Sequence, residues 1–188
     1  MTIFVLFPCL RGTAYQPDPE TCSVVSMFDS DLLRLAQGVL DRARAQNLHI
    51  ATAESCTGGL VAALLTEIPG ASDVVERGFV VYANAAKTEL LGVPEEFIAS
   101  HGAVSEEVAR AMTEGAMSRS RAQLAVAVTG VAGPSGGTPE KPVGLVHIAA
   151  ARQGRETHHE RHEFGDIGRT EIRLASVEAT LRLLLRVL

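Results

Sequence analysis

Ser55 and the two glycines that follow it are the first residues of the chain that could support a chemical reaction. They lie in the stretch TAESCTGGLVAALL, residues 52–65, where a short apolar strand should lead into a helix. A serine at this point is exposed at the carboxyl end of a sheet, where α/β proteins hold ligands, although most such residues, Thr57 included, only cap the helix. Gly58 and Gly59 favour a ligand site, because glycine costs a helix about 1 kcal/mol relative to alanine and leaves backbone N–H groups open to an anion.

Such N–H groups could bind a phosphate or stabilise the oxyanion of an acyl-transfer intermediate. Serine needs a nearby base to become a good nucleophile, and Lys87 in VVYANAAK is the candidate. It falls in the first turn of a short helix, where the helix dipole and some burial would lower the pKa of its amine. A solvated surface lysine is the alternative. Tyr82, just before that helix, could relay a proton, position a substrate or pack in the core.

Other nucleophiles and metal ligands are weaker candidates. Cys56 adjoins Ser55 and could replace it as the nucleophile, but a buried structural thiol is the commoner case. The histidines form no Ser/His/Asp set. His147 lies in an apolar strand, and the three histidines of the stretch HHERH, residues 158–162, lie in a polar strand. A metal site there is not expected.

The stretch TGVAGPSGGTPEKPVG, residues 129–144, is a glycine- and proline-rich loop after a buried apolar run. Its backbone could wrap an anion or a ribose phosphate, although a flexible connector would have the same composition. The GxxxxGK[ST] spacing of an ATP-binding P-loop is absent, so ATP hydrolysis is not supported.

The pattern of apolar residues predicts the elements that must position these groups. Helices are expected over 30–46, with Ser30 as N-cap, and over 56–68, 84–92 with Asn84 as cap, 94–100, 105–120 and 166–188. Strands are expected over 48–54, 74–83, 122–130, 143–151 and 156–164. Strands interleaved with helices predict a three-layer α/β/α sandwich, and the two closely spaced last strands predict a mixed, mostly parallel sheet.

Composition limits the class of protein. The 188 residues, 46% hydrophobic and 21% charged, are typical of one soluble globular domain, and no stretch is long and apolar enough to span a membrane. A net charge of -5 and 4% aromatic residues argue against nucleic-acid and acidic-membrane surfaces. Three cysteines make no disulfide scaffold, so a cytoplasmic protein is expected. Residues 1–26 look like a weakly ordered extension before a domain at 27–188, although TIFVLF could instead add an edge strand.

Four stretches together resemble a known family. TAESCTGG, VVYANAAKTELLGV, HGAVSEEVARAM and AVAVTGVAGPSGGTPEKPVGLVHIA have the order and spacing of the CinA C-terminal domain family, which includes the nicotinamide-nucleotide amidohydrolases (NMN deamidases). The resemblance covers residues 32–185. It implies hydrolysis of the carboxamide of nicotinamide mononucleotide to nicotinate mononucleotide and ammonia, a step of pyridine-nucleotide salvage that uses no metal or organic cofactor.

The resemblance also implies roles for individual residues. Ser55 would attack the amide carbon while Lys87, with or without Tyr82, takes its proton. Backbone amides of residues 57–59 would form the oxyanion hole, and the loop 129–137 would hold the ribose phosphate. The residues assigned to substrate binding are Glu54, Thr57, Gly58, Gly59, Asn84, Thr129, Gly130, Gly133, Gly136 and Gly137.

The sequence departs from the family at a few points. Ala83 replaces a more usual Ser or Thr, and His147 replaces a more usual aromatic residue. The larger N-terminal domain of full-length CinA proteins is not in this sequence, so their ADP-ribose pyrophosphatase activity is not expected.

Three functions remain open on the sequence alone. They are the NMN amidohydrolase, an enzyme acting on another nucleotide-linked amide, and a non-catalytic nucleotide-binding or competence-related interaction module. The leucines of LRLLLRVL, residues 181–188, indicate either a homodimer contact or burial against the sheet.

Overall fold

The computed structural model describes residues 26–188, so the predicted N-terminal extension lies almost wholly outside the described residues. The elements follow in the order α1 (Ser30–Ala45), β1 (Ile50–Glu54), α2 (Leu60–Glu67), the 3₁₀ turn η1 (Ala71–Asp73), β2 (Val75–Val80), α3 (Asn84–Leu91), α4 (Glu95–His101), α5 (Glu106–Ser118), β3 (Leu124–Gly130), β4 (Leu145–Arg152), β5 (His158–Glu163) and α6 (Arg169–Val187).

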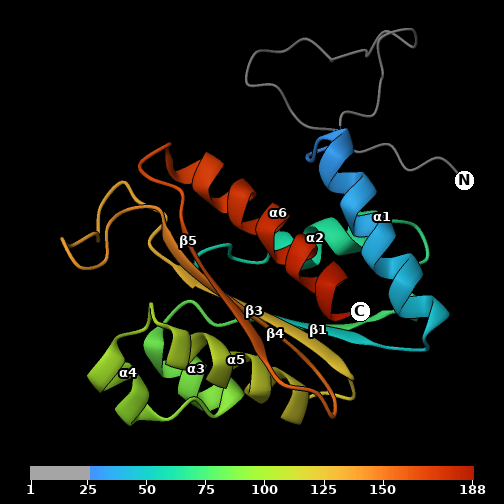
Figure 1. Ribbon diagram of the computed structural model, residues 1–188, viewed down its shortest axis with the longest axis horizontal. Coiled ribbons are helices and arrows are strands. Elements are labelled where there is room, and N and C mark those ends of the chain that lie inside the picture. Colours follow the sequence, from blue (N-terminus) through green and yellow to red (C-terminus); the bar gives the residue numbers. More distant parts are fainter. Residues whose placement is uncertain (1–25) are drawn as a thin grey trace, which may run out of the picture.

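The five strands of residues 26–188 form one mixed sheet in the order β2-β1-β3-β4-β5. Strand β1 lies parallel to both β2 and β3, whereas β4 is antiparallel to β3 and to β5. Four strands therefore point the same way and only β4 runs against them. Helices α1, α2 and α6 cover one face, and α3, α4 and α5 cover the other (Figure 1). The predicted three-layer α/β/α sandwich is confirmed.

The two faces of the sheet differ in the size of their side chains. Larger residues such as Ile50 and Val126 point toward α1, α2 and α6, while small residues point toward α5. The hydroxyl of Thr113 on α5 donates to the carbonyl of Ala149 on β4 at 3.1 Å, which shows how closely this helix lies on the sheet. The small residues that allow this approach from β1 and β3 are Ala51, Ala53, Ala125 and Ala127.

Four helix starts differ clearly from the predictions, and one of them is α6, which begins at Arg169 rather than at residue 166. The N-cap of α1 is Asp29, whose carboxylate accepts from the backbone N–H groups of Asp31 and Leu32. Ser30, predicted as the N-cap, is the first residue of the helix. The N-cap of α3 is Ala83, and Asn84 begins the helix. Helix α2 begins at Leu60 rather than at residue 56, because Gly58 and Gly59 have φ of 61° and 98° in the left-handed region.

The leucines at the end of α6 are buried. Leu181, Leu183 and Leu184 are no more than 2% exposed, and they join the core formed with α1 and the sheet. Burial accounts for this apolar run, and the homodimer stays a prediction without support from these side chains.

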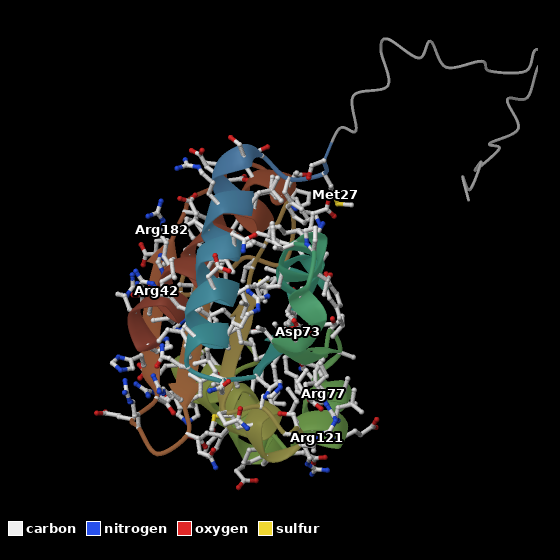
Figure 2. All side chains as sticks on the ribbon, turned by 90° about the vertical axis from the view of Figure 1, so that its right-hand side faces the viewer. Met27, Arg42, Asp73, Arg77, Arg121 and Arg182 are labelled. Atoms are coloured by element: carbon white, nitrogen blue, oxygen red, sulfur yellow. The ribbon has the colours of Figure 1, made fainter. Side chains whose placement is uncertain are left out.

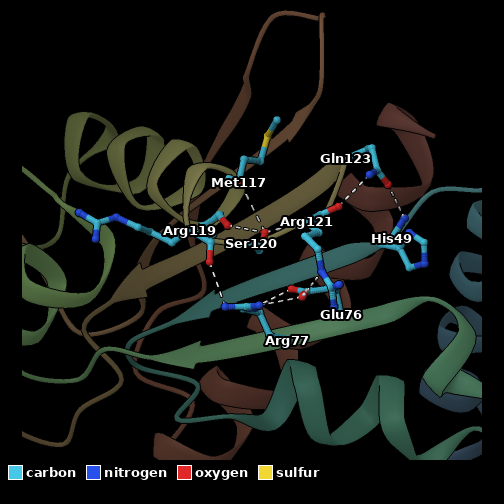
Figure 3. Close-up of polar contacts among 10 residues, drawn as sticks. His49, Glu76, Arg77, Met117, Arg119, Ser120, Arg121 and Gln123 are labelled. Carbon is cyan, nitrogen blue, oxygen red and sulfur yellow. Dashed lines mark hydrogen bonds and ion pairs between the residues drawn. The ribbon is translucent and has the colours of Figure 1, made fainter.

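A polar network ties β2 to the α5–β3 connection at the amino ends of the parallel strands (Figure 3). Arg77 donates to the carbonyl of Arg119 at 3.0 Å, and Glu76 lies between Arg77 and Arg121. These contacts fix the edge strand at the end of the sheet opposite the functional groups.

Candidate active site

The ends of three parallel strands bring the predicted site residues together. Ser55 follows β1 directly, and its backbone N–H donates to the carbonyl of Val128 on β3 at 3.0 Å. In the register of the sheet Val80 lies beside Glu54, so the segment after β2 reaches the same edge. This is the edge at which α/β sheets hold ligands.

Lys87 lies inside the protein and points at Ser55. Its Nζ donates to Ser55 Oγ at 3.2 Å and to the carbonyls of Val81 and Tyr82 at 2.9 and 3.3 Å. The residue is only 1% exposed, which excludes the alternative of a solvated surface lysine. Burial is the main cause that lowers the pKa of the Lys87 amine below its usual 10.5. A lysine with a lowered pKa can act as a general base for serine.

Glu54 holds the start of α2. Its carboxylate is 1% exposed and accepts from the N–H groups of Gly59, Val61 and Ala62 at 2.9–3.0 Å, and from the hydroxyl of Thr57 at 2.8 Å. These are the N–H groups that a helix start leaves without partners inside the helix. The buried Glu54 carboxylate therefore takes the place of an N-cap side chain for α2. Its assignment to substrate binding stays a prediction.

The backbone N–H groups of Gly58 and Gly59, expected to bind an oxyanion, instead donate to oxygens of the protein itself. Gly58 N–H donates to the carbonyl of Ser55 at 3.1 Å, and Gly59 N–H donates to Glu54. A Cβ on either glycine would meet no atom closer than 3.4 Å, so their positive φ, and not a close approach, requires glycine. Within residues 26–188, the amides of the turn that donate to no oxygen are those of Cys56 and Thr57. Of the amides expected to form an oxyanion hole, those of Gly58 and Gly59 are thus already paired within the protein, and the N–H groups of Cys56 and Thr57 lie beside the Cys56 thiol.

Cys56 is a poor alternative nucleophile. It is 5% exposed, and burial raises the pKa of its thiol to about 12 against the opposing effect of the neighbouring backbone N–H groups. Because the thiolate is the reactive form, a raised pKa disfavours Cys56 as the nucleophile near neutral pH.

Tyr82 contributes to the site by its carbonyl and by its exposed ring. The carbonyl accepts from Lys87, while the hydroxyl accepts from Arg169 Nη2 at 3.0 Å. The side chain is 60% exposed. A proton relay through the Tyr82 hydroxyl is not needed, because Lys87 reaches Ser55 directly.

The loop after β3 lies beside these groups, and its residues have different surroundings. Thr129 is buried and its hydroxyl donates to the carbonyl of Ala103 at 2.8 Å. At Gly130 a Cβ would lie 2.7 Å from Val146, so only glycine fits against β4. Gly133 has a φ of 74°, and its carbonyl accepts from Arg169 at 2.7 Å. Asn84, Gly136 and Gly137 are exposed, and their assignment to the substrate stays a prediction.

Two arginines that the sequence reasoning missed reach the site from α6. Arg169 spans the Gly133 carbonyl and the Tyr82 hydroxyl, and Arg173 Nη2 donates to the carbonyl of Thr57 at 2.8 Å. They stand one helical turn apart, at i and i+4, and therefore point the same way. That spacing was the available signal, but nothing in the sequence places the start of the last helix beside Ser55.

The histidines lie elsewhere. His147 Nδ1 and His159 Nε2 are 3.0 Å apart on the α5 side of the sheet, and His159 faces Glu106. Burial, followed by the charges of His159 and Arg161, lowers the pKa of His147 to about 4. In residues 26–188 no three His, Cys, Asp or Glu side chains are grouped as metal ligands. No helix in the same range is long and apolar enough to cross a bilayer.

Two cavities lie away from the Ser55–Lys87 pair. One of about 240 Å³ is lined by residues at the start of α5 and by Lys141 and His147, and one of about 480 Å³ adjoins the β4–β5 turn. We place the candidate site by its chemistry, since neither cavity is lined by a nucleophile paired with a base.

Comparison with curated proteins finds relatives over most of the described residues. A CinA-like protein from Akkermansia muciniphila is 58% identical over 126 residues, 67% of this chain and 30% of its own length. A CinA-like protein from Anaeromyxobacter sp. (strain K) is 53% identical over 154 residues, 81% of this chain and 38% of its own length. The chain thus spans less than two fifths of these relatives.

Solved structures agree in fold. The competence/damage inducible protein CihA from Agrobacterium tumefaciens has a TM-score of 0.85 and 51% identity, and the match covers 87% of this chain and 99% of that one. A CinA superfamily protein from Escherichia coli has a TM-score of 0.80 and 32% identity, covering 88% and 96%. The sequence model of the CinA C-terminal domain matches residues 32–188. The chain belongs to the CinA C-terminal domain family.

Proposed function

We propose that the protein hydrolyses the carboxamide of nicotinamide mononucleotide, releasing nicotinate mononucleotide and ammonia. The observation that carries the proposal is the buried Lys87 amine 3.2 Å from the Ser55 hydroxyl, with a pKa lowered by burial. A serine with a lysine base is a recognised arrangement for acyl transfer. The motifs around both residues support the nicotinamide nucleotide as substrate.

The first half of the reaction forms an ester. Neutral Lys87 takes the proton of Ser55 Oγ as this oxygen attacks the carboxamide carbon, and the carbonyl oxygen becomes an oxyanion. The tetrahedral intermediate then collapses, and its C–N bond breaks. Lys87 returns the proton to the departing nitrogen, which leaves as ammonia. Ser55 is now esterified by the nicotinoyl group, and Lys87 is neutral again.

The second half consumes one water molecule. Lys87 takes a proton from water as its oxygen attacks the ester carbon, and it gives this proton to Ser55 Oγ when the C–O bond of the ester breaks. The product is a carboxylate, and the proton of the acid goes to solvent or ammonia. Ser55 and Lys87 end in their starting states.

The backbone amides of Cys56 and Thr57 would stabilise both oxyanions. They follow the nucleophile directly, and within residues 26–188 they donate to no other oxygen. Donors fixed before the reaction stabilise developing charge without reorganisation, and removal of one such donor costs about 3 kcal/mol of transition-state stabilisation.

Arg169 would hold the phosphate. Its partners among the described residues, the Gly133 carbonyl and the Tyr82 hydroxyl, are neutral, so its charge has no carboxylate to balance it. A guanidinium in the first turn of a helix is disfavoured by the helix dipole, and a bound phosphate would offset that cost. The exposed Tyr82 ring beside it offers a flat apolar surface to the nucleotide.

The experiment is to incubate the full chain with nicotinamide mononucleotide and measure ammonia and nicotinate mononucleotide. We expect turnover by the wild type and a loss of at least about a thousandfold in kcat for Ser55→Ala and for Lys87→Ala. Ser72→Ala is the matched control, because this serine is exposed in η1 at the other end of the sheet.

The outcomes separate the functions. Activity that survives Ser55→Ala would reject Ser55 as nucleophile. A folded wild type that binds the nucleotide but releases no ammonia would reject the amidohydrolase in favour of a binding module. Release of ammonia only from other nucleotide-linked amides would reject the substrate and keep the chemistry.

A further inference from the structure

The turn between Ser55 and Gly58 carries the two candidate oxyanion donors. It consists of three peptide units, and the middle one contains the N–H of Thr57. The first unit is fixed because its carbonyl, that of Ser55, accepts from Gly58 N–H at 3.1 Å.

The third peptide unit is held by Arg173. Its carbonyl, that of Thr57, accepts from Arg173 Nη2 at 2.8 Å and from Leu60 N–H at 3.4 Å. The guanidinium lies over the turn, since a Cβ on Gly58 would be 3.4 Å from Arg173 Nη2. Arg173 stands 116 residues after Thr57, so this contact fastens the turn to a segment far away in the sequence, the first turns of α6.

The contact with Arg173 differs from an ordinary surface hydrogen bond. Arg173 Nε is buried without a hydrogen-bond partner in the described part of the chain. A buried donor without a partner destabilises the folded state, so stability alone does not explain an arginine at this position. The Thr57 carbonyl alone does not balance a guanidinium charge. The positive field of the Arg173 guanidinium acts on the turn. There it lowers the pKa of the Cys56 thiol, against the larger effect of burial, which raises that pKa.

We infer that Arg173 is a positioning residue of the oxyanion hole: through the Thr57 carbonyl and the Gly58 N–H it keeps the N–H of Cys56 aimed at the reacting carbonyl. The unit that Arg173 holds also carries the Gly58 N–H, and this N–H fixes the Ser55 carbonyl and with it the unit that carries the Cys56 N–H. Polarisation of the Thr57 carbonyl by the cation passes through the Gly58 N–H and the Ser55 carbonyl to the Cys56 N–H, and the field of the cation itself also favours an oxyanion there. The inference rests on the proposed acyl-transfer chemistry of Ser55.

A positioning role predicts a defect in kcat. In Arg173→Met we expect kcat for nicotinamide mononucleotide to fall by about tenfold to a hundredfold, less than for loss of a whole donor, with KM changed by less than about threefold. Arg173→Lys keeps the charge without the planar fork and should recover part of the loss. Thermal unfolding of each variant checks that the fold is retained.

Arg169 supplies the contrasting variant one turn away. Arg169→Met should raise KM with a smaller effect on kcat, because this residue is assigned to the bound substrate. Arg182→Met is the control for altering α6 itself. Arg182 lies on the outer surface of the helix, paired with Glu178, and both kinetic constants should stay as in the wild type (Figure 2).

A second readout does not depend on the nucleotide. The rate at which a fluorophosphonate probe labels Ser55 requires the nucleophile and the oxyanion donors, and we expect it to fall in Arg173→Met and to be unaffected in Arg182→Met. A raised KM with unchanged kcat would overturn the inference and make Arg173 a substrate ligand. If the wild type hydrolyses no nicotinamide mononucleotide, the proposed substrate fails, but undiminished labelling in Arg173→Met would still be needed to reject the positioning role.

Discussion

At the scale of single residues, the site depends on one amine kept from water. Lys87 is among the largest fully buried side chains of the described residues, and three oxygens accept from its Nζ. Those oxygens are a hydroxyl and two carbonyls, none of which carries a charge. With no carboxylate to balance an ammonium, burial favours the neutral amine and lowers the pKa of Lys87, which is what a base for Ser55 requires.

The first prediction concerns the pH dependence of catalysis. Because only neutral Lys87 accepts a proton, kcat/KM should rise with pH, and its midpoint should fall below the ordinary lysine value of 10.5. The measurement is a pH–rate profile of the wild type for which folding has been checked at each pH. Lys87→Arg, whose side chain stays charged, should show no such rise. A midpoint at or above 10.5 would contradict the role of burial.

The same shift affects stability. At pH values between the lowered pKa of Lys87 in the folded protein and its usual pKa, the unfolded chain binds more protons than the folded one. The free energy of unfolding therefore increases as pH rises through that window. Burial of Lys87 is thus a cost at neutral pH that is relieved in alkali.

At the scale of elements, two helices owe their placement to single residues. Glu54 supplies at the start of α2 what a capping serine or aspartate supplies elsewhere, from inside the sheet. Gly115 on α5 lets α3 approach, since a Cβ there would lie 2.1 Å from the carbonyl oxygen of Leu91. Both contacts determine where the residues around Ser55 and Lys87 stand.

The second prediction tests the Glu54 cap. Glu54→Gln would turn an amide NH₂ toward at least one backbone N–H that can only donate, whichever way the amide points, and we expect the free energy of unfolding to fall by about 2–4 kcal/mol. Chemical denaturation measures it. Asp29→Asn at the exposed start of α1 is the control, because asparagine caps a helix as well as aspartate does. Equal stabilities for the two variants would show that the buried carboxylate contributes no more than an exposed cap.

The third prediction compares two helical glycines. Gly115→Ala should destabilise the protein by more than about 2 kcal/mol and also lower kcat, because α3 and its Lys87 must move away from α5. Gly38→Ala on α1 meets its nearest atom, of Leu185, at 3.9 Å, and should stabilise by about 0.5–1 kcal/mol. Thermal or chemical unfolding and an amidase assay check both. A stable, active Gly115→Ala would show that α3 has room to shift without loss.

At the scale of the whole molecule, the sheet joins segments that are far apart in sequence. The strand ends after β1, β2 and β3 and the start of α6 meet at one edge, and the residues of the candidate site span 54–173. The family match, residues 32–188, contains all of them.

The fourth prediction follows from that span. A chain that begins at residue 26 should keep kcat/KM within about twofold of the full chain, since no residue assigned to the reaction precedes it. The measurement is the nicotinamide mononucleotide assay on both forms at equal concentrations of folded protein. A large loss of activity in a folded short form would assign residues 1–25 a part in function.

Much of this architecture could be predicted from the sequence, because local chemistry specifies it. Alternating and continuous apolar runs identified the strands and helices, and the close spacing of the last two strands identified the mixed sheet. Ser55, Lys87 and the glycine-rich loop were found by residue type and by family resemblance. The error at the start of α2 arose because the pattern does not distinguish a glycine inside a helix from one in a left-handed turn before it.

Only the tertiary structure determined which groups touch. Burial of Lys87 against Ser55, occupation of the Gly59 amide by Glu54, and the approach of Arg173 to Thr57 join residues up to 116 positions apart. No local pattern encodes such pairs, because they depend on strand order, helix packing and the desolvation that follows from both. The sequence by itself determined the chemistry available to this protein, and the fold determined which of those groups are dry, paired and aimed at a substrate.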